Sequence, residues 1–134
     1  MSKLVLLVDD SHLMRQELRN LFESEPDFEV AGEVEHGEEA VGKAEELQPD
    51  LIVLDLSMPG MNGLEAAPIL LNKVPNVILV LVTNYASYAM AAPAREAGIH
   101  AVVPKNQAAT HLMPTIRALF AGEPPSPASR PAVA

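Results

Sequence analysis

Side chains that can do chemistry follow four of the five apolar runs in this sequence, within two residues of the last apolar position. They are Asp9, Asp10, Asp55, Thr83 and Lys105. Only the second run, at residues 28–34, ends without such a residue. One acidic residue at the end of a run is often only a turn former or a helix cap. Four runs that end in this way indicate a shared site, because ligands of open α/β sheets bind beyond the carboxyl ends of the strands.

The three aspartates predict a divalent cation. Carboxylates gathered at neighbouring strand ends repel one another, so one would take up a proton unless a cation lay among them. Oxygen ligands, with no cysteine in the chain and no paired histidines, favour Mg²⁺ or Mn²⁺ over zinc. Lys105 and Thr83 could hold an anion against that metal. A metal, a carboxylate nucleophile, an ammonium and a hydroxyl are together what acceptance of a phosphoryl group requires.

The five apolar runs predict the strands that position these residues. Three of them are nearly continuous in valine, leucine and isoleucine, which is typical of parallel strands covered on both faces. The second run, FEVAGEV, has polar insertions and suits an exposed edge strand. The runs lie at residues 4–8, 28–34, 51–54, 77–82 and 101–103.

The segments between the runs have helical spacing. Ser11 is the expected N-cap of the first helix, Pro49 stops the second, and Gly98 suits the C-terminal cap of the fourth. Pro93 and Pro114 lie well inside the fourth and fifth segments, where each costs a backbone hydrogen bond and kinks its helix or delays its start. The helical segments are residues 11–25, 36–48, 63–74, 86–98 and 107–122.

Five alternating strands and helices predict an α/β domain with a parallel sheet and right-handed crossovers. The folded part should end near Ala121. Residues 122–134 contain four prolines and no apolar period. This stretch indicates a semi-extended tail, or a linker to a part that is absent here.

Composition excludes several classes of function. The 134 residues are enough for one domain with one core. No apolar run approaches the roughly 18 residues of a membrane span, and the start lacks the layout of a signal peptide, so we expect a cytoplasmic protein. The net charge of -9 argues against direct binding of nucleic acid. The four histidines are scattered and are expected at the surface or as caps.

The ordered motifs VDDS, LDLSMPGMNG, LVTN and VVPK along a five-fold βα pattern resemble the receiver domain of bacterial two-component response regulators. The chemotaxis regulators are one such group. The resemblance covers about residues 3–121, with residues 122–134 as the tail or linker. It implies a flavodoxin-like, doubly wound (βα)5 sandwich with strand order 2-1-3-4-5. It also implies that the domain catalyses its own phosphotransfer and a slow autodephosphorylation.

The resemblance assigns a role to each residue at the strand ends. It implies that Asp55 accepts a phosphoryl group from a histidine kinase, while Thr83 hydrogen-bonds that group and Lys105 pairs with it. For Mg²⁺ it implies direct binding by Asp10 and Asp55, binding mainly through water by Asp9, and a further ligand from the backbone carbonyl of Ser57.

The nucleophile and the loop after it have physical requirements of their own. We expect Asp55 to be unprotonated and exposed in the crevice, on a rigid strand end that allows in-line attack. Gly60 and Gly63 suit the loop because glycine allows positive φ, and Pro59 stiffens it.

Four positions depart from the family pattern. Val102 replaces the aromatic residue that commonly precedes the lysine by three positions and rotates inward on phosphorylation. Asn106 replaces the usual proline after the lysine, so we expect a trans or a strained peptide bond there. Asn84 replaces a very small residue and restricts access to Asp55. Pro93 remodels the partner face made by the fourth helix, the last strand and the fifth helix.

The partners that the resemblance implies are a sensor histidine kinase or phosphotransfer protein, and a downstream protein or an absent C-terminal effector on that partner face. A homodimer is a further option. LVTNYAS and the missing proline resemble receivers that precede helix-turn-helix output domains. One alternative is a phosphorylation-independent pseudo-receiver, which Val102 and Asn106 favour. Another is an aspartyl phosphohydrolase, which needs a second carboxylate where Ser57 lies.

Overall fold

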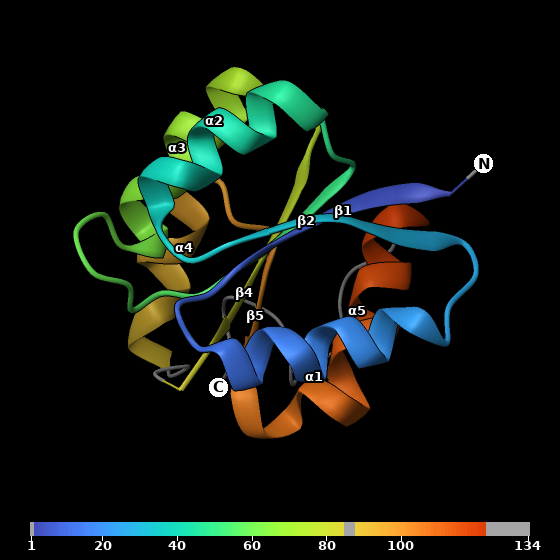
Figure 1. Cartoon of the computed structure of the whole chain (residues 1–134). Helices are drawn as coiled ribbons and strands as arrows, with labels where there is room; N and C mark the ends of the chain where they lie inside the picture. Colours follow the sequence, from blue (N-terminus) through green and yellow to red (C-terminus); the bar gives the residue numbers. More distant parts are fainter. Residues whose placement is uncertain (1, 85–87, 123–134) are drawn as a thin grey trace.

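The computed structural model describes residues 2–84 and 88–122, in which strands alternate with helices along the chain (Figure 1). Short 3-10 turns precede the last two α-helices. The elements are β1 (Lys3–Val8), α1 (His12–Glu23), β2 (Phe28–Val34), α2 (Gly37–Leu47), β3 (Leu51–Leu54), α3 (Gly63–Lys73), β4 (Ile78–Thr83), η1 (Tyr88–Met90), α4 (Ala91–Glu96), β5 (Ala101–Pro104), η2 (Lys105–Gln107) and α5 (Ala108–Phe120).

The five strands form one parallel sheet in the order β2-β1-β3-β4-β5. This order confirms the flavodoxin-like topology that the sequence predicts. It places β1 and β3 side by side in the middle, with Val8 opposite Leu54. The edge position of β2 is confirmed as well, since most of its residues are only partly buried.

Helices cover both faces of the sheet: α2, α3 and α4 lie on one side and α1 and α5 on the other (Figure 1). Alternate residues of the central strands supply the two halves of the core. Leu6, Ile52 and Leu81 belong to the α2–α3–α4 half, and Leu7 and Val53 belong to the α1–α5 half. Burying one such leucine contributes about 1.5–3 kcal/mol. The strands are therefore rigid supports for whatever follows them.

Two of the predicted helix caps are confirmed. The Ser11 hydroxyl accepts a hydrogen bond from the Met14 N–H at 3.2 Å, so α1 begins after Ser11. Gly98 follows α4 with a φ of 90°, and the N–H groups of Gly98 and Ile99 donate to the carbonyls of Arg95 and Ala94. This paired pattern is a Schellman motif, which ends the helix.

The fourth helix is much shorter than the predicted segment at residues 86–98. The α-helix comprises Ala91–Glu96, so Pro93 lies in its first turn rather than well inside it. A first-turn N–H has no intrahelical acceptor, so the missing proline N–H costs little there. Residues 85–87 lie outside the described part of the chain. In α5, by contrast, Pro114 lies inside a continuous helix that begins at Ala108.

The described helices are all too short or too polar to cross a membrane. The described residues end at Gly122, two residues after α5. The remainder of the predicted tail, residues 123–134, lies outside them, and its assignment as a tail or linker stays a prediction.

Candidate functional site

Asp9 and Asp55 extend the two central strands by one residue at their carboxyl ends. The Asp55 N–H donates to the Val8 carbonyl at 2.9 Å, and the Asp9 N–H donates to the Val34 carbonyl at 3.1 Å. The backbone of each aspartate is therefore still hydrogen-bonded to the neighbouring strand at the residue that carries the carboxylate. This pairing provides the rigid mount that sequence reasoning predicts.

The structure brings the three predicted aspartates together. One carboxylate oxygen each from Asp9, Asp10 and Asp55 lies within 4.8 Å of the others. Asp10 is exposed, whereas Asp9 and Asp55 are only 2% and 4% exposed. The expectation of an exposed Asp55 is therefore wrong. Its backbone still pairs with the sheet, and the side chain of Lys105 lies against its carboxylate, so little of it contacts solvent.

Lys105 places one positive charge among these carboxylates. Its Nζ lies 3.1 Å from Asp9 Oδ2 and 3.4 Å from Asp55 Oδ2. Burial acts to lower the pKa of Lys105, but its hydrogen bond to Asp9 and the charges of both carboxylates outweigh burial and raise that pKa. The side chain is thus held as an ammonium between two buried carboxylates.

The carboxyl group of Asp55 is a weaker acid than an ordinary aspartic acid. Burial raises its pKa to about 6, the neighbouring Asp9 adds to the rise, and Lys105 and a hydrogen bond from the Ser57 N–H oppose it. Near pH 7 the group is therefore mostly ionised, but close to its titration range. A carboxylate with an unfavourable local environment gains more than usual from a cation or from bond formation.

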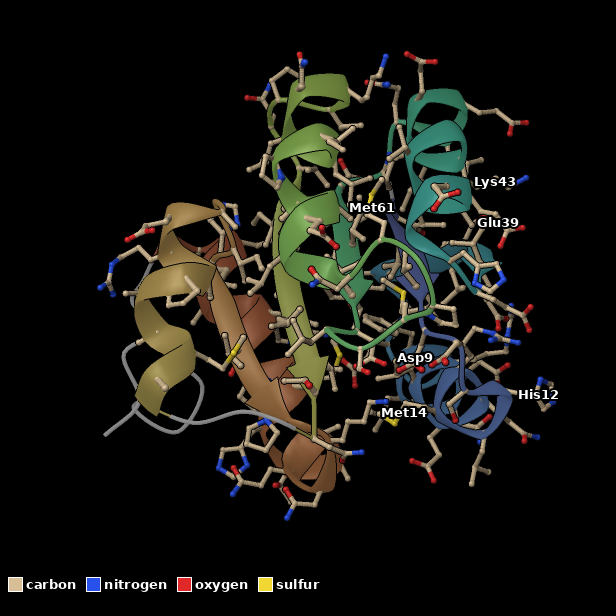
Figure 2. The ribbon with its side chains drawn as sticks, turned by 90° about the vertical axis from the view of Figure 1, so that its left-hand side faces the viewer. Asp9, His12, Met14, Glu39, Lys43 and Met61 are labelled. Carbon is tan, nitrogen blue, oxygen red and sulfur yellow. The ribbon has the colours of Figure 1, made fainter. Side chains whose placement is uncertain are left out.

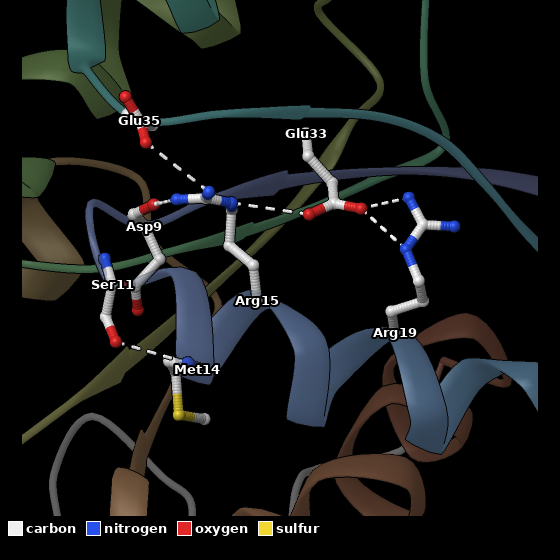
Figure 3. Close-up of polar contacts among 7 residues, drawn as sticks. All are labelled: Asp9, Ser11, Met14, Arg15, Arg19, Glu33 and Glu35. Carbon is white, nitrogen blue, oxygen red and sulfur yellow. Dashed lines mark hydrogen bonds and ion pairs between the residues drawn. The ribbon is translucent and has the colours of Figure 1, made fainter.

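Hydrogen bonds fix Asp9 on both sides of its α-carbon (Figure 3). Its Oδ1 accepts from the Ser11 N–H at 2.8 Å, while its backbone carbonyl accepts from Nη1 of Arg15 at 2.6 Å. No motif in the sequence points to Arg15. The end of β2 was also expected to lack a chemical residue, yet Glu35 follows that strand and its Oε1 lies 3.4 Å from Nη2 of Arg15.

Thr83 and Ser57 occupy the places that their motifs predict. Thr83 is the last residue of β4, lies beside Pro104 in the sheet and is fully buried. Ser57 is exposed in the loop between β3 and α3. The structure thus sets a hydroxyl and the β3–α3 loop at the same edge of the sheet as the aspartates.

The glycines of that loop have two different roles. Gly60 has a φ of 78°, as expected. Gly63 does not have a positive φ, so that expectation is wrong; it begins α3 so close to β3 that a Cβ atom would lie 2.4 Å from the Asp55 carbonyl oxygen. In Figure 2 the loop is the segment that carries Met61. A Cβ on Gly37, at the start of α2, would lie 3.1 Å from the Met61 Cβ, so the loop packs against that helix.

The departures from the family pattern have clear structural counterparts. Val102 is 2% exposed and packs in the α2–α3–α4 half of the core. The Lys105–Asn106 bond is trans, as expected, since no described peptide bond is cis. Asn84 is exposed and, with Lys105 and Asn106, lines a groove of about 380 Å³ beside the first turn of α1.

Comparison with known protein families gives one match that covers most of the chain. Residues 5–117 match the family model described as the response regulator receiver domain. The match includes every residue of the candidate site.

Curated relatives agree with this match. The chain is 37% identical over 120 residues to the transcriptional regulatory protein LiaR of Bacillus subtilis, covering 90% of this chain and 57% of that protein. It is 39% identical over 98 residues to the chemotaxis protein CheY of Thermotoga maritima, covering 73% of this chain and 81% of that protein. The chain thus spans only a little over half of the LiaR relative.

Solved structures show the same fold. A LuxR-family two-component response regulator from Aurantimonas superposes with a TM-score of 0.86 at 31% identity, covering 92% of this chain and 89% of that one. The response regulator domain of Thermotoga maritima CheB superposes with a TM-score of 0.81 at 33% identity, covering 87% and 95%.

Proposed function

The chain belongs to the family of response regulator receiver domains, and on this basis we propose that Asp55 accepts a phosphoryl group from a phosphohistidine. The donor is a sensor histidine kinase or a phosphotransfer protein in the cytoplasm. The observation that carries the proposal is the Lys105 ammonium between the buried carboxylates of Asp9 and Asp55. This arrangement keeps a nucleophilic carboxylate ionised beside a group that attracts phosphoryl oxygens.

The donor set fits Mg²⁺, with Mn²⁺ as the second choice. Receiver domains of this family bind Mg²⁺ at an acidic pocket, and here three carboxylate oxygens lie within 4.8 Å of one another. Hard oxygen ligands of this kind suit Mg²⁺. Asp10, Asp55 and the Ser57 carbonyl would hold the ion, with Asp9 acting mainly through water. When bound, the ion neutralises negative charge on the phosphoryl oxygens.

Side chains of this protein carry out the phosphoryl transfer in a single displacement. A carboxylate oxygen of Asp55 attacks phosphorus, a P–O bond forms, and the P–N bond to the donor imidazole breaks with its electron pair on nitrogen. Lys105 pairs with the phosphoryl oxygens, and the Thr83 hydroxyl donates a hydrogen bond to one of them. The acyl phosphate that results is hydrolysed by water, so the signal is temporary.

Output from this domain must follow a route other than rotation of an aromatic residue. Val102 already lies in the core and has only a short side chain, so it cannot exchange between solvent and interior. We propose residues 3–121 as the receiver and residues 122–134 as a tail or linker. The face formed by α4, β5 and α5 then contacts a downstream protein, a C-terminal effector or a second copy of the chain.

The same buried Val102 favours one alternative, a pseudo-receiver that binds its partner without phosphorylation. Partner binding would then be unchanged by Asp55→Ala. If Asp55 is instead a phosphoacceptor, the affinity for the partner changes when Asp55 is phosphorylated.

Intact-mass spectrometry after incubation with Mg²⁺ and acetyl phosphate, or with a cognate kinase, tests the proposal. The wild type should gain one phosphoryl group, and Asp55→Asn should gain none. Asp27→Asn is the matched control, because Asp27 is an exposed aspartate at the opposite end of the sheet, paired with Arg117. No mass gain of the wild type with either donor would refute the phosphoacceptor function.

A further inference from the structure

Arg15 extends from α1 to the carboxyl end of β1 and makes three polar contacts there (Figure 3). Its Nη1 donates to the Asp9 carbonyl at 2.6 Å, its Nε lies 3.3 Å from Glu33 Oε1, and its Nη2 lies 3.4 Å from Glu35 Oε1. The side chain is only 10% exposed. An arginine is buried to this extent only where its donors find acceptors.

The Asp9 carbonyl needs a partner because β2 ends too early to supply one. The Asp9 N–H bonds to the Val34 carbonyl, which is the last residue of β2. In a continued parallel ladder, the Asp9 carbonyl would accept from the backbone N–H two residues after Val34. The strand has ended there, and the guanidinium of Arg15 takes the place of that donor in a buried hydrogen bond.

The peptide group that Arg15 holds is the one that joins Asp9 to Asp10. Fixing the plane of this peptide fixes the α-carbon of Asp10, whose exposed carboxylate is not buried or packed like that of Asp9. We propose that Arg15 is a positioning residue that sets the Asp10 carboxylate beside Asp9 and Asp55 for cation binding. This inference rests on the proposed function and assigns the support of its metal site.

The direction in which cation affinity changes when Arg15 is removed distinguishes a role through position from a role through charge. A guanidinium near three carboxylates repels a divalent cation, so a role through charge alone predicts tighter metal binding when Arg15 is removed. A role through position predicts weaker binding. Loss of a group that orients a metal ligand typically weakens metal affinity by about 10–100-fold.

Arg19 offers a matched control on the same helix. Like Arg15, it pairs with Glu33, and its Nε lies 2.6 Å from Glu33 Oε2. No described contact joins Arg19 to Asp9. Removing Arg19 therefore perturbs the same ion-pair network and also removes one positive charge. The hydrogen bond from Arg15 to the peptide between Asp9 and Asp10 is kept.

The test is Mn²⁺ binding to the purified chain, followed by loss of the electron paramagnetic resonance signal of free Mn²⁺, with Mg²⁺ competition. We expect Arg15→Met to weaken binding by about tenfold or more and Arg19→Met to change it by less than about twofold. Arg15→Lys should fall between wild type and Arg15→Met, because one ammonium cannot span the carbonyl and both glutamates. Circular dichroism checks that each variant is folded.

Unchanged or tighter binding by Arg15→Met would overturn the inference, and so would an equal loss in Arg19→Met. If Arg15→Met does not fold, Arg15→Lys and Arg19→Lys form the deciding pair, and equal affinities of these two would overturn it. A wild-type chain that binds neither Mn²⁺ nor Mg²⁺ would instead refute the metal site of the proposed function. The two failures are therefore distinguishable.

Discussion

The ammonium of Lys105 lies 3.4 Å from Oδ2 of Asp55, in a site where the aspartate is only 4% exposed. A buried carboxylate without a cation would tend to take up a proton and lose its nucleophilicity. Lys105 opposes that protonation and also lies where it can pair with incoming phosphoryl oxygens. One side chain therefore prepares the nucleophile and stabilises the product.

Replacing this lysine should slow phosphorylation strongly. Lys105→Met removes the charge that opposes protonation of Asp55 and that pairs with the phosphoryl group. We expect the rate with acetyl phosphate at saturating Mg²⁺ to fall on the order of 10²-fold, as for other preorganised electrostatic groups. Timed intact-mass measurements give this rate. A fall of less than about threefold would show that Lys105 does not act on the reaction.

The raised pKa of Asp55 makes its ionisation unfavourable for folding. Because the folded-state pKa is about 6 and the ordinary value is 3.8, the folded state binds the proton more tightly, and stability falls as pH rises between these values. This difference between the two pKa values of Asp55 corresponds to roughly 3 kcal/mol. In the absence of metal, Asp55→Asn should therefore be more stable than wild type at about pH 8, by an amount that shrinks towards pH 4.

Urea unfolding at several pH values in the presence of a chelator measures this difference. Added Mg²⁺ should reduce it, because the ion stabilises only a protein that keeps its carboxylate. If the free energies of unfolding of wild type and Asp55→Asn differ by the same amount at every pH, the pKa of Asp55 is not raised in the folded state.

His100 should give a pH dependence of the opposite sign. Its Nδ1 accepts the Leu79 N–H at 3.0 Å, one residue before β5 begins, and the partial burial of the ring lowers its pKa. A group with a lowered folded-state pKa stabilises above its ordinary value and loses that contribution as pH falls. Wild type should therefore lose more stability between about pH 7 and pH 5 than His100→Asn, whose side-chain oxygen can still accept.

The same unfolding series tests this prediction, with His12→Asn as the control at an exposed position on α1. Comparison between variants is required because Asp55 titrates in the same range with the opposite effect. If His100→Asn follows the wild type at every pH, the ring has no role in this dependence.

The close approach at Gly63 predicts a large difference between two glycine substitutions. In Gly63→Ala the new methyl group would lie 2.4 Å from the Asp55 carbonyl oxygen, which is backbone and cannot move aside. We expect a loss of about 1–3 kcal/mol or more. In Gly42→Ala nothing lies within 4 Å of the new methyl, and a helix-interior alanine should stabilise by about 0.5–1 kcal/mol. Thermal unfolding of both variants checks the pair.

Much of the site follows from composition and topology alone. Apolar runs predict the strands, and parallel strands bring their carboxyl ends to one edge of the sheet. The topology therefore predicts that Asp9, Asp55 and Lys105 lie close together. The burial of Asp55 could not be predicted, because it depends on where Lys105 lies. For the fourth helix the sequence left open whether Pro93 would kink the helix or delay its start, and the α-helix starts late, at Ala91.

Other features depend on contacts between distant segments. Arg15 interrupts no pattern on α1. Its role arises because β2 ends two residues before the position whose N–H would otherwise donate to the Asp9 carbonyl. The one available signal was Glu35, an acidic residue directly after an apolar run. Gly63 similarly appears as a loop glycine until α3 is packed against β3.

Locating the phosphoryl group on the chain tests directly whether Asp55 is the phosphoacceptor. After incubation with Mg²⁺ and acetyl phosphate, borohydride reduction converts an aspartyl phosphate to homoserine, which peptide mass spectrometry can assign to a single position. We expect conversion at Asp55 alone, with none in Lys105→Met at matched early times. Conversion at Asp9 or Asp10, or none anywhere in the wild type, would contradict this expectation.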